Sequence, residues 1–531
     1  MRSMAKQFYF GGSVLTMETP LYAEAVLVAD GRIAAVGRRC DLEPLAEGAQ
    51  RIDLKGAVLL PGFIDPHSHY TNYATALLQA SVENAECFDD IRRLIQEFIR
   101  QKELPAGKWI TVKGFDQTKL VEKCPPDRTL LDEAAPQNPV LLLHQSGHTG
   151  VFNTLALEEL AVTAQTPAPE GGRIAQKDGR LTGYMEEAAL VTYMQRIPLA
   201  SVEELLAAYR EAQRVYASHG ITTMQDGMAM DVMAGLYQAL CAAHILQLDL
   251  VAYVDLHASE QLLKIFAANI DTYQEHFKIG GYKTFLDGSP QARTAWMRQP
   301  YEGAQDGYCG YPTLSDEQLL ANIRRALREG RQLLAHCNGD AAAQQYIDQF
   351  TKALGELDDA PDIRPVMIHA QLLGKDQMPA MKEIGMMPSF FVAHVYHWGD
   401  VHLQNFGPQR AGAISAAKSA GELGLPYTFH QDAPVIEPDM LETIWCAVNR
   451  LTKKGVLLGP EERVTPLEAL RAVTVNAAYQ YFEEREKGSI CPGKRADLVI
   501  LDADPTKVDP MAIRGIKVLA TIKDGACVYR A

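Results

Sequence analysis

The feature that most restricts the fold of this chain is a regular alternation of short apolar segments with helix-like ones through its middle. Segments with helical patterning, such as 201–219 and 315–329, separate apolar segments of strand length. Strands that alternate with helices predict βα units and a parallel sheet. Eight such units predict an α/β fold with a closed TIM-type (β/α)8 barrel. The eight apolar segments lie at 58–69, 221–226, 248–253, 279–285, 332–336, 365–369, 385–391 and 427–432.

The two ends of the chain have a different pattern, with short strands and tight turns. Asp30-Gly31 separates two apolar runs, and a second Asp-Gly pair, Asp524-Gly525, interrupts the strand-like segment 518–529. Asp-Gly between apolar runs is a hairpin signal. We therefore expect a small β-sandwich that both termini build. The predicted domains are a β-sandwich of 1–60 plus 489–531, a barrel of 61–71 plus 201–488, and an insertion of 72–200.

The insertion at 72–200 does not fit the count of eight barrel units. It has strand-like segments of its own at 109–112 and 140–143, and a turn-rich hairpin candidate at 171–180. We interpret it as an α+β insertion after the first barrel strand. Active sites of such barrels lie at the carboxyl ends of the strands, so an insertion there is expected to cap the site.

The composition of the chain limits the classes of partner that it is expected to bind. The chain has 531 residues, a formal net charge of −15 and a pI of about 5.5. An acidic surface argues against nucleic acid or an anionic membrane as a partner, because both need basic patches. Nine scattered cysteines without a Cys-x-x-Cys pair, no signal-like N-terminus and no apolar run long enough for a bilayer predict a cytoplasmic protein. The expected partner is a small-molecule substrate, and the sequence is compatible with a homodimer.

Titratable residues gather where the predicted strands end. Parallel strands of a barrel bring their carboxyl ends to one mouth, so these side chains are expected to meet there. Histidine is scarce, with 14 in the chain, which makes the gathering favour a metal site. Each histidine alone is more often structural, and a lysine here could instead be paired to a buried carboxylate. The residues are His67 and His69 (first strand), Lys283 (fourth), His336 (fifth), His369 (sixth) and Asp432 (eighth).

His67 and His69 form a His-x-His pair that ends an apolar run. If the strand continues through them, both side chains point to the same face, about 6.6 Å apart at about 3.3 Å per residue. Two imidazoles at that separation can bind one ion at about 2.0–2.1 Å each.

These residues lie in motifs that resemble the metal-dependent amidohydrolase superfamily. More narrowly, the chain is similar to its amidohydrolase-3 branch, which includes N-substituted formamide deformylases. The resemblance covers nearly the whole chain. The matching motifs are Leu60-Pro61-Gly62-Phe63-Ile64-Asp65-Pro66-His67-Ser68-His69, Tyr282-Lys283-Thr284-Phe285-Leu286-Asp287-Gly288-Ser289, His336-Cys337-Asn338-Gly339-Asp340, Asp432-Ala433-Pro434-Val435, and the segments 465–470 and 487–498.

The resemblance implies a site with two divalent ions, expected to be zinc. His67 and His69 would bind the buried ion, and His336 and His369 the exposed one. Lys283, carboxylated by CO₂, would bridge both ions. Asp432 would contact metal and nucleophilic water, and act as general base and then general acid. The implied activity is hydrolysis of a carbon–nitrogen bond of the amide type, in a linear N-substituted formamide or N-acyl compound.

Four further residues are candidates for substrate contacts. His148, in a Gly-His pair that the family also has, either donates to the substrate oxygen in catalysis or is a surface-loop histidine. His394 and His397 follow the seventh strand, and at least one is expected to face the pocket. Arg293 follows the fourth strand, where it binds either a carboxylate or a backbone carbonyl.

The chain also departs from the family pattern beside two candidate ligands. Family members commonly have Ser or Thr before the eighth-strand Asp, and here Gln431 follows His430. They commonly have Glu before the sixth-strand His, and here it is Ile368. The ligands themselves are present, so hydrolysis is still expected, but the pocket walls differ.

Three alternatives remain open at this stage. A deaminase or a cyclic amidohydrolase of the same superfamily is the nearest. Superfamily deaminases usually lack the bridging lysine and have His-x-x-Glu after the fifth strand, whereas this chain has Lys283 and, after His336, Cys337-Asn338-Gly339. A catalytically silent barrel that serves as an interaction module is the third, although such relatives lose metal ligands first.

Overall fold

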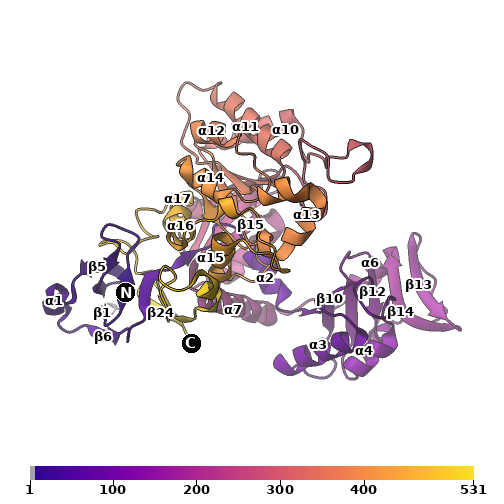
Figure 1. Cartoon of the computed structure of the whole chain (residues 1–531). Coiled ribbons are helices and arrows are strands. Elements are labelled where there is room, and N and C mark those ends of the chain that lie inside the picture. The colour runs from indigo at the N-terminus through magenta and orange to yellow at the C-terminus, as the bar shows by residue number, and fades with distance from the viewer. Residues whose placement is uncertain (1–5) are drawn as a thin grey trace. The chain divides into compact units, whose positions relative to one another are not determined.

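The computed structural model describes residues 6–531 of the chain (Figure 1). Its largest sheet has eight parallel strands. The sheet curls until its first and last strands meet just beyond their ends. There the Asp432 N–H donates to the His67 carbonyl at 3.3 Å, and the His69 N–H donates to the Ala433 carbonyl at 2.8 Å. The sheet therefore fits a TIM-type barrel. In sheet order its strands are β8 (Phe63–Ile64), β15 (Ile221–Ala229), β16 (Asp249–Asp255), β17 (Phe277–Phe285), β18 (Gln332–Cys337), β19 (Val366–His369), β20 (Met387–Phe390) and β21 (Thr428–Phe429).

Helices between the strands begin and end at local signals. In α10 (Asp316–Glu329) the Ser315 side chain accepts from the Gln318 N–H, and the Gln318 side chain accepts from the Ser315 N–H. Gly330, at φ 61°, ends this helix in the left-handed conformation that glycine tolerates. The helical prediction for 315–329 is confirmed to within one residue. The other helices of this part are α7 (Val202–Ser218), α8 (Ala234–Ala242), α9 (Glu260–Ile265), α11 (Asp340–Leu354), α12 (Met378–Glu383), α13 (His394–Gly412), α14 (Ala417–Glu422), α15 (Met440–Asn449), α16 (Pro466–Ala472) and α17 (Val475–Gln480).

The first predicted strand is two strands in the structure. β7 (Val58–Pro61) pairs with β22 (Leu498–Leu501) in a sheet outside the barrel, and β8 belongs to the barrel. Gly62 joins them where a Cβ would lie 2.4 Å from Thr222 Cγ2, so only glycine fits.

The prediction that His67 and His69 continue the strand is wrong. β8 ends at Ile64, and Pro66 follows two residues later, without a backbone N–H to extend the ladder. The two histidines instead follow a bend, and their rings lie 5.2 Å apart at 72°.

Two sheets are built from the ends of the chain. Both Asp-Gly hairpins are confirmed, with left-handed φ of 50° and 75° at Asp30-Gly31 and 49° and 78° at Asp524-Gly525. The four-stranded sheet has the order β5 (Arg32–Gly37), β4 (Ala25–Ala29), β1 (Gln7–Phe10), β6 (Gln50–Asp53). The six-stranded sheet has the order β24 (Ala526–Arg530), β23 (Val518–Lys523), β22, β7, β2 (Ser13–Leu15), β3 (Tyr22–Ala23).

Apolar side chains of both sheets share one buried cluster. Tyr9 and Val26 come from the four-stranded sheet, and Leu59, Leu498 and Ile522 from the six-stranded one. The cluster therefore joins residues from the two ends of the chain.

Residues 73–209 form a compact unit of their own, and residues 6–72 with 210–531 form the other. The sequence predicts an insertion at 72–200. Asp178-Gly179, both at positive φ, make the turn of the expected hairpin. The unit has one sheet of order β13 (Gly172–Lys177), β14 (Arg180–Glu187), β12 (Thr149–Phe152), β11 (Val140–His144), β10 (Ile110–Phe115), β9 (Ala80–Ser81), and the helices α3 (Phe88–Gln101), α4 (Arg128–Ala134), α5 (Thr154–Glu159) and α6 (Ala188–Met194).

Two predictions from composition concern the chain as a whole. All nine cysteines are free thiols, so no disulfide stabilises either unit. Over residues 6–531, every helix is too short or too polar to cross a bilayer.

Candidate metal centre

The six residues predicted as metal ligands meet at the carboxyl ends of the barrel strands. Nε2 of His67 and Nε2 of His69 lie 3.4 and 3.3 Å from Asp432 Oδ1. Nε2 of His369 lies 4.0 Å from Asp432 Oδ2 and 3.0 Å from Nδ1 of His336. One carboxylate therefore faces three imidazoles, and a fourth lies beside them.

Lys283 lies beside this group. It stands near the end of β17, and its Nζ lies 3.2 Å from Nε2 of His67. No carboxylate oxygen of residues 6–531 comes within 4 Å of this amine. The amine thus faces an imidazole rather than an ion-pair partner.

The donor set fits a divalent ion. The ligand atoms of His67, His69 and Asp432 all lie within 4.8 Å of one another. Oδ1 of Asp432 is buried and, within the described part of the chain, accepts no hydrogen bond. A buried carboxylate oxygen without a donor is costly unless a cation satisfies it. Imidazole nitrogen and carboxylate oxygen are ligands that suit zinc and other first-row divalent metals.

Burial keeps the imidazoles in the form that binds metal. It lowers the pKa of His67 and His369 well below the usual value, and that of His336 to about 4, with the charge of Lys283 acting in the same direction. These histidines are therefore neutral at pH 7, and each keeps one ring nitrogen with a free lone pair.

The pKa values of Lys283 and Asp432 are both lowered, for different reasons. Burial lowers the pKa of Lys283 to about 7, and only the charge of Asp432 opposes this. Burial raises the pKa of Asp432, but the adjacent His69 and the charges of His430 and Lys283 outweigh it, so the pKa ends below its usual value. At neutral pH the carboxyl is ionised and the amine is partly neutral.

Gln225, near the middle of β15, determines which nitrogen of His67 faces the centre. Its amide Nε2 donates to the Pro66 carbonyl at 2.6 Å and to the Tyr481 hydroxyl at 2.8 Å. Its Oε1 is thereby left to face Nδ1 of His67 at 2.6 Å, which must carry the proton. Nε2 of His67 then presents its lone pair to the other candidate ligands.

Gly227 provides the space for the two histidine rings of the His-x-His pair. A Cβ at this position would lie 2.6 Å from Cε1 of His67 and 3.0 Å from Cε1 of His69. Any larger residue would displace both rings, so glycine is required there by contact rather than by backbone conformation.

Two of the candidate ligands have strained backbones. His369 has φ 73° and Asp432 has φ 57°, a left-handed conformation that non-glycine residues adopt at a cost of about 1–3 kcal/mol. Such strain gathers at functional sites, where the surrounding structure holds it. Here it turns both side chains out of the ends of their strands.

The predicted substrate residues lie in several places. His148 belongs to the unit of residues 73–209, where its side chain is 67% exposed and its Nδ1 lies 3.0 Å from Glu187. Its role in catalysis stays a prediction. Arg293 donates to the Glu302 carbonyl and lies 5.2 Å from the centre of the Tyr301 ring, which is the backbone-carbonyl alternative named above.

The two histidines of α13 differ in environment. His394 is buried, with Nδ1 3.1 Å from Nε2 of His402 and its ring 4.6 Å from that of Phe391. The ring of Phe391 in turn lies 5.3 Å from that of His430. Phe391 therefore contacts both His394 and His430. His397 is hydrogen-bonded to Glu442 at 2.8 Å.

Several contributing residues were not assigned a role from the sequence. Asp287 is buried and accepts the backbone N–H groups of Trp296, Asn338 and Gly339 at 2.7–2.9 Å, which ties together the segments that follow β17 and β18. Its place in the motif after Lys283 could have revealed it. Gln225 and Gly227 carry no local signal, because their roles depend on contacts with residues about 160 positions away.

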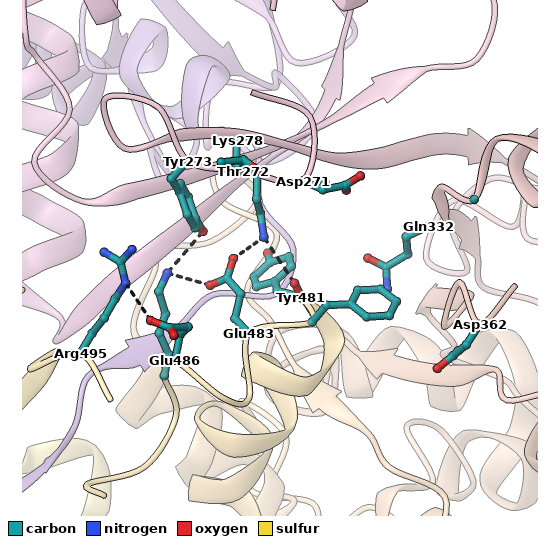
Figure 2. Close-up of a pocket in the computed structure, with 14 residues that line it drawn as sticks. Asp271, Thr272, Tyr273, Lys278, Gln332, Asp362, Tyr481, Glu483, Glu486 and Arg495 are labelled. Carbon is teal, nitrogen blue, oxygen red and sulfur yellow. Dashed lines mark hydrogen bonds and ion pairs between the residues drawn. The ribbon is translucent and has the colours of Figure 1, made fainter. Parts of the chain in front are cut away.

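A cavity of about 530 Å³ lies at the other end of the barrel (Figure 2). Lys278, Gly280 and Gln332 line it from the beginnings of β17 and β18. Lys278 precedes Lys283 by five residues, or about 16 Å along an extended strand. None of the six candidate ligands lines this cavity, so it is separate from the candidate metal centre.

A parallel eight-stranded barrel that gathers imidazoles, an amine and a carboxylate at the carboxyl ends of its strands belongs to the class of metal-dependent barrel hydrolases. The pattern of the amidohydrolase family, in its third branch, matches residues 50–529. The chain belongs to this family. It is a metal-dependent enzyme that acts on carbon–nitrogen bonds other than peptide bonds.

Individual relatives match nearly the whole chain. The N-substituted formamide deformylase of Arthrobacter pascens is 29% identical, over 96% of this chain and 95% of its own length. The protein LONG AFTER FAR-RED 3 of Arabidopsis thaliana is 26% identical, over 98% and 90%. Among solved structures, a metal-dependent hydrolase of Pyrococcus horikoshii has a TM-score of 0.75 at 23% identity, over 95% of this chain and 99% of that one.

Proposed function

We propose that this enzyme hydrolyses the carbon–nitrogen bond of a linear amide, an N-substituted formamide or another N-acyl compound, to an acid and an amine. The observation that carries the proposal is the convergence of four imidazoles, one buried amine and one carboxylate at one end of the barrel. The similarity to the Arthrobacter deformylase supports the formamide part.

The residues present would suit two divalent ions, which we propose to be zinc. His67 and His69 would hold one ion and His336 and His369 the other, and Lys283 and Asp432 would contact both. The chemistry that such bound ions supply is activation of water near neutral pH and polarisation of a carbonyl oxygen.

Lys283 is suited to carboxylation. With its pKa lowered to about 7, about half of the molecules hold a free amine at neutral pH. Its nitrogen can add to the carbon of CO₂, forming a carbamate as the amine releases a proton to solvent. The product replaces a buried cation by an anion with two oxygens, which accounts for a lysine that has no carboxylate within 4 Å among residues 6–531.

Asp432 is assigned the proton transfers. Its carboxylate is ionised, and its Oδ1 is free of hydrogen bonds among the described residues. It can accept the proton of the attacking water and later give it to the departing amine nitrogen, as one carboxylate can do in both steps. The left-handed backbone at Asp432 keeps it turned toward the imidazoles.

A substrate panel tests the reaction. N-formyl, N-acyl and cyclic amides are incubated with the zinc-loaded enzyme, and acid, amine and ammonia are measured separately. Release of formate or another acid together with an amine is expected for linear amides. Ammonia as the sole nitrogen product would establish a deaminase instead, and turnover of ring amides alone would establish a cyclic amidohydrolase.

Variants test the assignment of roles. Lys283→Ala and Asp432→Ala are expected to abolish turnover, and His67→Gln to lower the zinc content measured by elemental analysis. His244→Gln is the matched control, because His244 is 75% exposed and its one ion pair among residues 6–531 is with Glu275, away from the candidate ligands. Full activity of either alanine variant would contradict the roles proposed here. A wild-type chain that binds zinc but turns over nothing would favour the silent barrel.

A further inference from the structure

Three buried side chains lie in a row behind the candidate metal centre, at the ends of three neighbouring strands. Nδ1 of His430, after β21, lies 2.9 Å from Oγ of Ser389, in β20. Nε2 of the same ring lies 3.1 Å from Nδ1 of His369, in β19. Ser389 and His430 are fully buried, and His369 is 4% exposed. His430 stands two residues before Asp432, at the motif where this chain departs from its family.

His430 does not have the position of a ligand. Both of its ring nitrogens already have a partner, and neither partner is Asp432. Its ring centre lies 5.1 Å from that of His369 and 5.2 Å from that of His67. Its hydrogen bond to a candidate ligand is the one with His369.

The position of one proton decides whether His369 can hold an ion. Nε2 of His369 is the atom that faces His336 and Asp432. A neutral imidazole carries one N–H, so a lone pair on Nε2 requires the proton on Nδ1. That proton is then donated to Nε2 of His430, and the proton of His430 lies on Nδ1 and is donated to the Ser389 oxygen. Every nitrogen in this row is used once.

The opposite direction also satisfies each atom. The Ser389 hydroxyl would donate to Nδ1 of His430, Nε2–H of His430 would donate to Nδ1 of His369, and Nε2–H of His369 would donate to Nδ1 of His336. In that arrangement His369 has no lone pair for an ion. His67 differs, because Gln225 can face it only with its oxygen.

We propose that His430 and Ser389 are positioning residues for His369. Nε2 of His430 accepts the Nδ1–H of His369, the Ser389 oxygen accepts the Nδ1–H of His430, and the Nε2 lone pair of His369 is thereby presented to the metal centre. The inference rests on the proposed role of His369 as a ligand. It explains why a histidine, which can accept on one side and donate on the other, fits a position between a serine and a candidate ligand. An ion at Nε2 would select this direction of the row, and the row would in turn favour the ion.

Zinc affinity of the metal-free protein tests this without any measurement of turnover. The dissociation constants of wild type, His430→Gln and His430→Met are measured by competition with a chromophoric chelator. Methionine has a similar size and offers the His369 proton only a weak thioether acceptor, whereas the glutamine oxygen can replace Nε2. We expect the methionine variant to bind the ion assigned to His336 and His369 10–100-fold less tightly, and the glutamine variant to stay within about threefold of wild type. Equal affinities for wild type and His430→Met, or equal losses in both variants, would overturn the proposal.

A second pair of variants works at the far end of the row and removes less volume. Ser389→Ala deprives Nδ1–H of His430 of its acceptor and favours the unproductive direction, so we expect a clear loss of zinc affinity. Ser389→Thr keeps the hydroxyl and is expected to keep the affinity. If His430→Met does not fold, this pair decides alone, and matching affinities for Ala and Thr would contradict the proposal.

Histidine ¹⁵N spectra of the zinc-loaded protein provide a direct readout of the tautomers. We expect both His369 and His430 to carry their protons on Nδ1, and a proton on Nε2 of His430 would refute the inference. Failure of the proposed function has a different signature, because the wild-type protein would then bind no zinc or hydrolyse no amide. Wild-type zinc binding with unchanged variants would reject only the role of His430 and Ser389.

Discussion

The two ends of the barrel bury lysines in opposite circumstances. At the carboxyl end, Lys283 has no carboxylate within 4 Å in the described chain, and burial lowers its pKa to about 7. At the amino end, Lys487 lies 2.5 Å from Asp249 and 2.7 Å from Glu483. Burial lowers the pKa of Lys487 too, but the charges of Asp249 and Glu483 raise it above its usual value. Both amines are buried, yet the pKa of Lys283 is lowered and that of Lys487 is raised, because Lys487 has two carboxylates beside it.

Lys523 extends the paired group at the amino end. Its Nζ lies 2.9 Å from Asp249 and 3.0 Å from Asp497, and burial of this amine is outweighed by these charges, so its pKa is raised. Asp249, His276 and Asp524 have the spacing of a metal site, but the ammonium groups of the two lysines already neutralise these carboxylates. Figure 2 shows the part of this network that surrounds Glu483.

The ion pairs at the amino end stabilise the fold, whereas the groups at the carboxyl end are available for chemistry. The amino-end network links β16, β23 and the segment after α17, which are far apart in sequence, and satisfies its charges. The carboxyl end has, among residues 6–531, an amine without a carboxylate partner and a buried carboxylate oxygen without a hydrogen-bond donor. Barrels of this type place their active sites at the carboxyl end, whereas the opposite face serves stability. Substitutions at either end of the barrel test this difference.

Removal of a paired lysine should have the largest effect on stability. Lys523→Met leaves Asp249 and Asp497 buried with fewer counter-charges, and we expect a loss of about 3–5 kcal/mol in the free energy of unfolding. Urea denaturation of the metal-free protein measures it. Lys507→Met is the control, since Lys507 is 57% exposed and its pair with Asp504 is worth at most about 1 kcal/mol. Equal midpoints for the two variants would remove the distinction.

Removal of Lys283, which has no carboxylate beside it in the described chain, should raise the free energy of unfolding. Lys283→Met exchanges a buried amine without a carboxylate for an apolar side chain of similar length. We expect the metal-free variant to be more stable than wild type at pH 7 by about 1–3 kcal/mol, although it has lost turnover. Denaturation in CO₂-depleted buffer keeps carboxylation out of the comparison. A destabilised variant would show that Lys283 has a stabilising partner.

The pH dependence of that gain follows from the pKa of Lys283. The folded pKa is about 7 and the unfolded one about 10.4, so the folded state binds its proton more weakly. The cost of the buried lysine is therefore complete below pH 7 and declines as the pH rises toward about 10. We expect the stability difference between Lys283→Met and wild type to shrink over this range. A difference that grows with pH would contradict the direction of the shift.

The ion pairs at the amino end should lose their contribution to stability in acid. The pKa of Glu483 is lowered to about 2 because Lys487 and Lys278 outweigh its burial, and that of Asp249 is lowered as well. Their stabilisation is present above the unfolded pKa of about 4 and is lost as the pH falls toward 2. Wild type and Lys283→Met should both lose stability in this range, by similar amounts. Measurements of the urea midpoint between pH 5 and 2 check this.

The smallest expected effect comes from one methyl group at the carboxyl end. Gly227→Ala places a Cβ 2.6 Å from His67 Cε1 and should weaken zinc binding about tenfold, or about 1.4 kcal/mol, by displacing the ring. Gly235→Ala in α8 meets no atom within 4 Å and serves as the control with unchanged zinc affinity. If both variants bind zinc like wild type, the centre tolerates displacement of this histidine.

Much of the fold and of the candidate site could be predicted from local patterns. The helix at 315–329 and the Asp-Gly hairpins were predicted because capping residues, turn residues and apolar periodicity act over a few positions. The candidate ligands stand out because they end apolar segments. The break at Gly62 and the bend before His67 were missed, because they depend on Thr222 in a neighbouring strand and on a proline inside an otherwise strand-like run.

Local sequence patterns therefore predict which segments become barrel strands and which side chains stand at their ends. The orientation and charge of those side chains depend on contacts that form only in the folded chain. Gln225 orients His67 from 158 residues away, His430 faces His369 from 61, and Lys487 neutralises Asp249 from 238. The physical reason is that periodicity records which face of an element is buried, whereas a proton's position and a pKa depend on the particular atoms packed against that face.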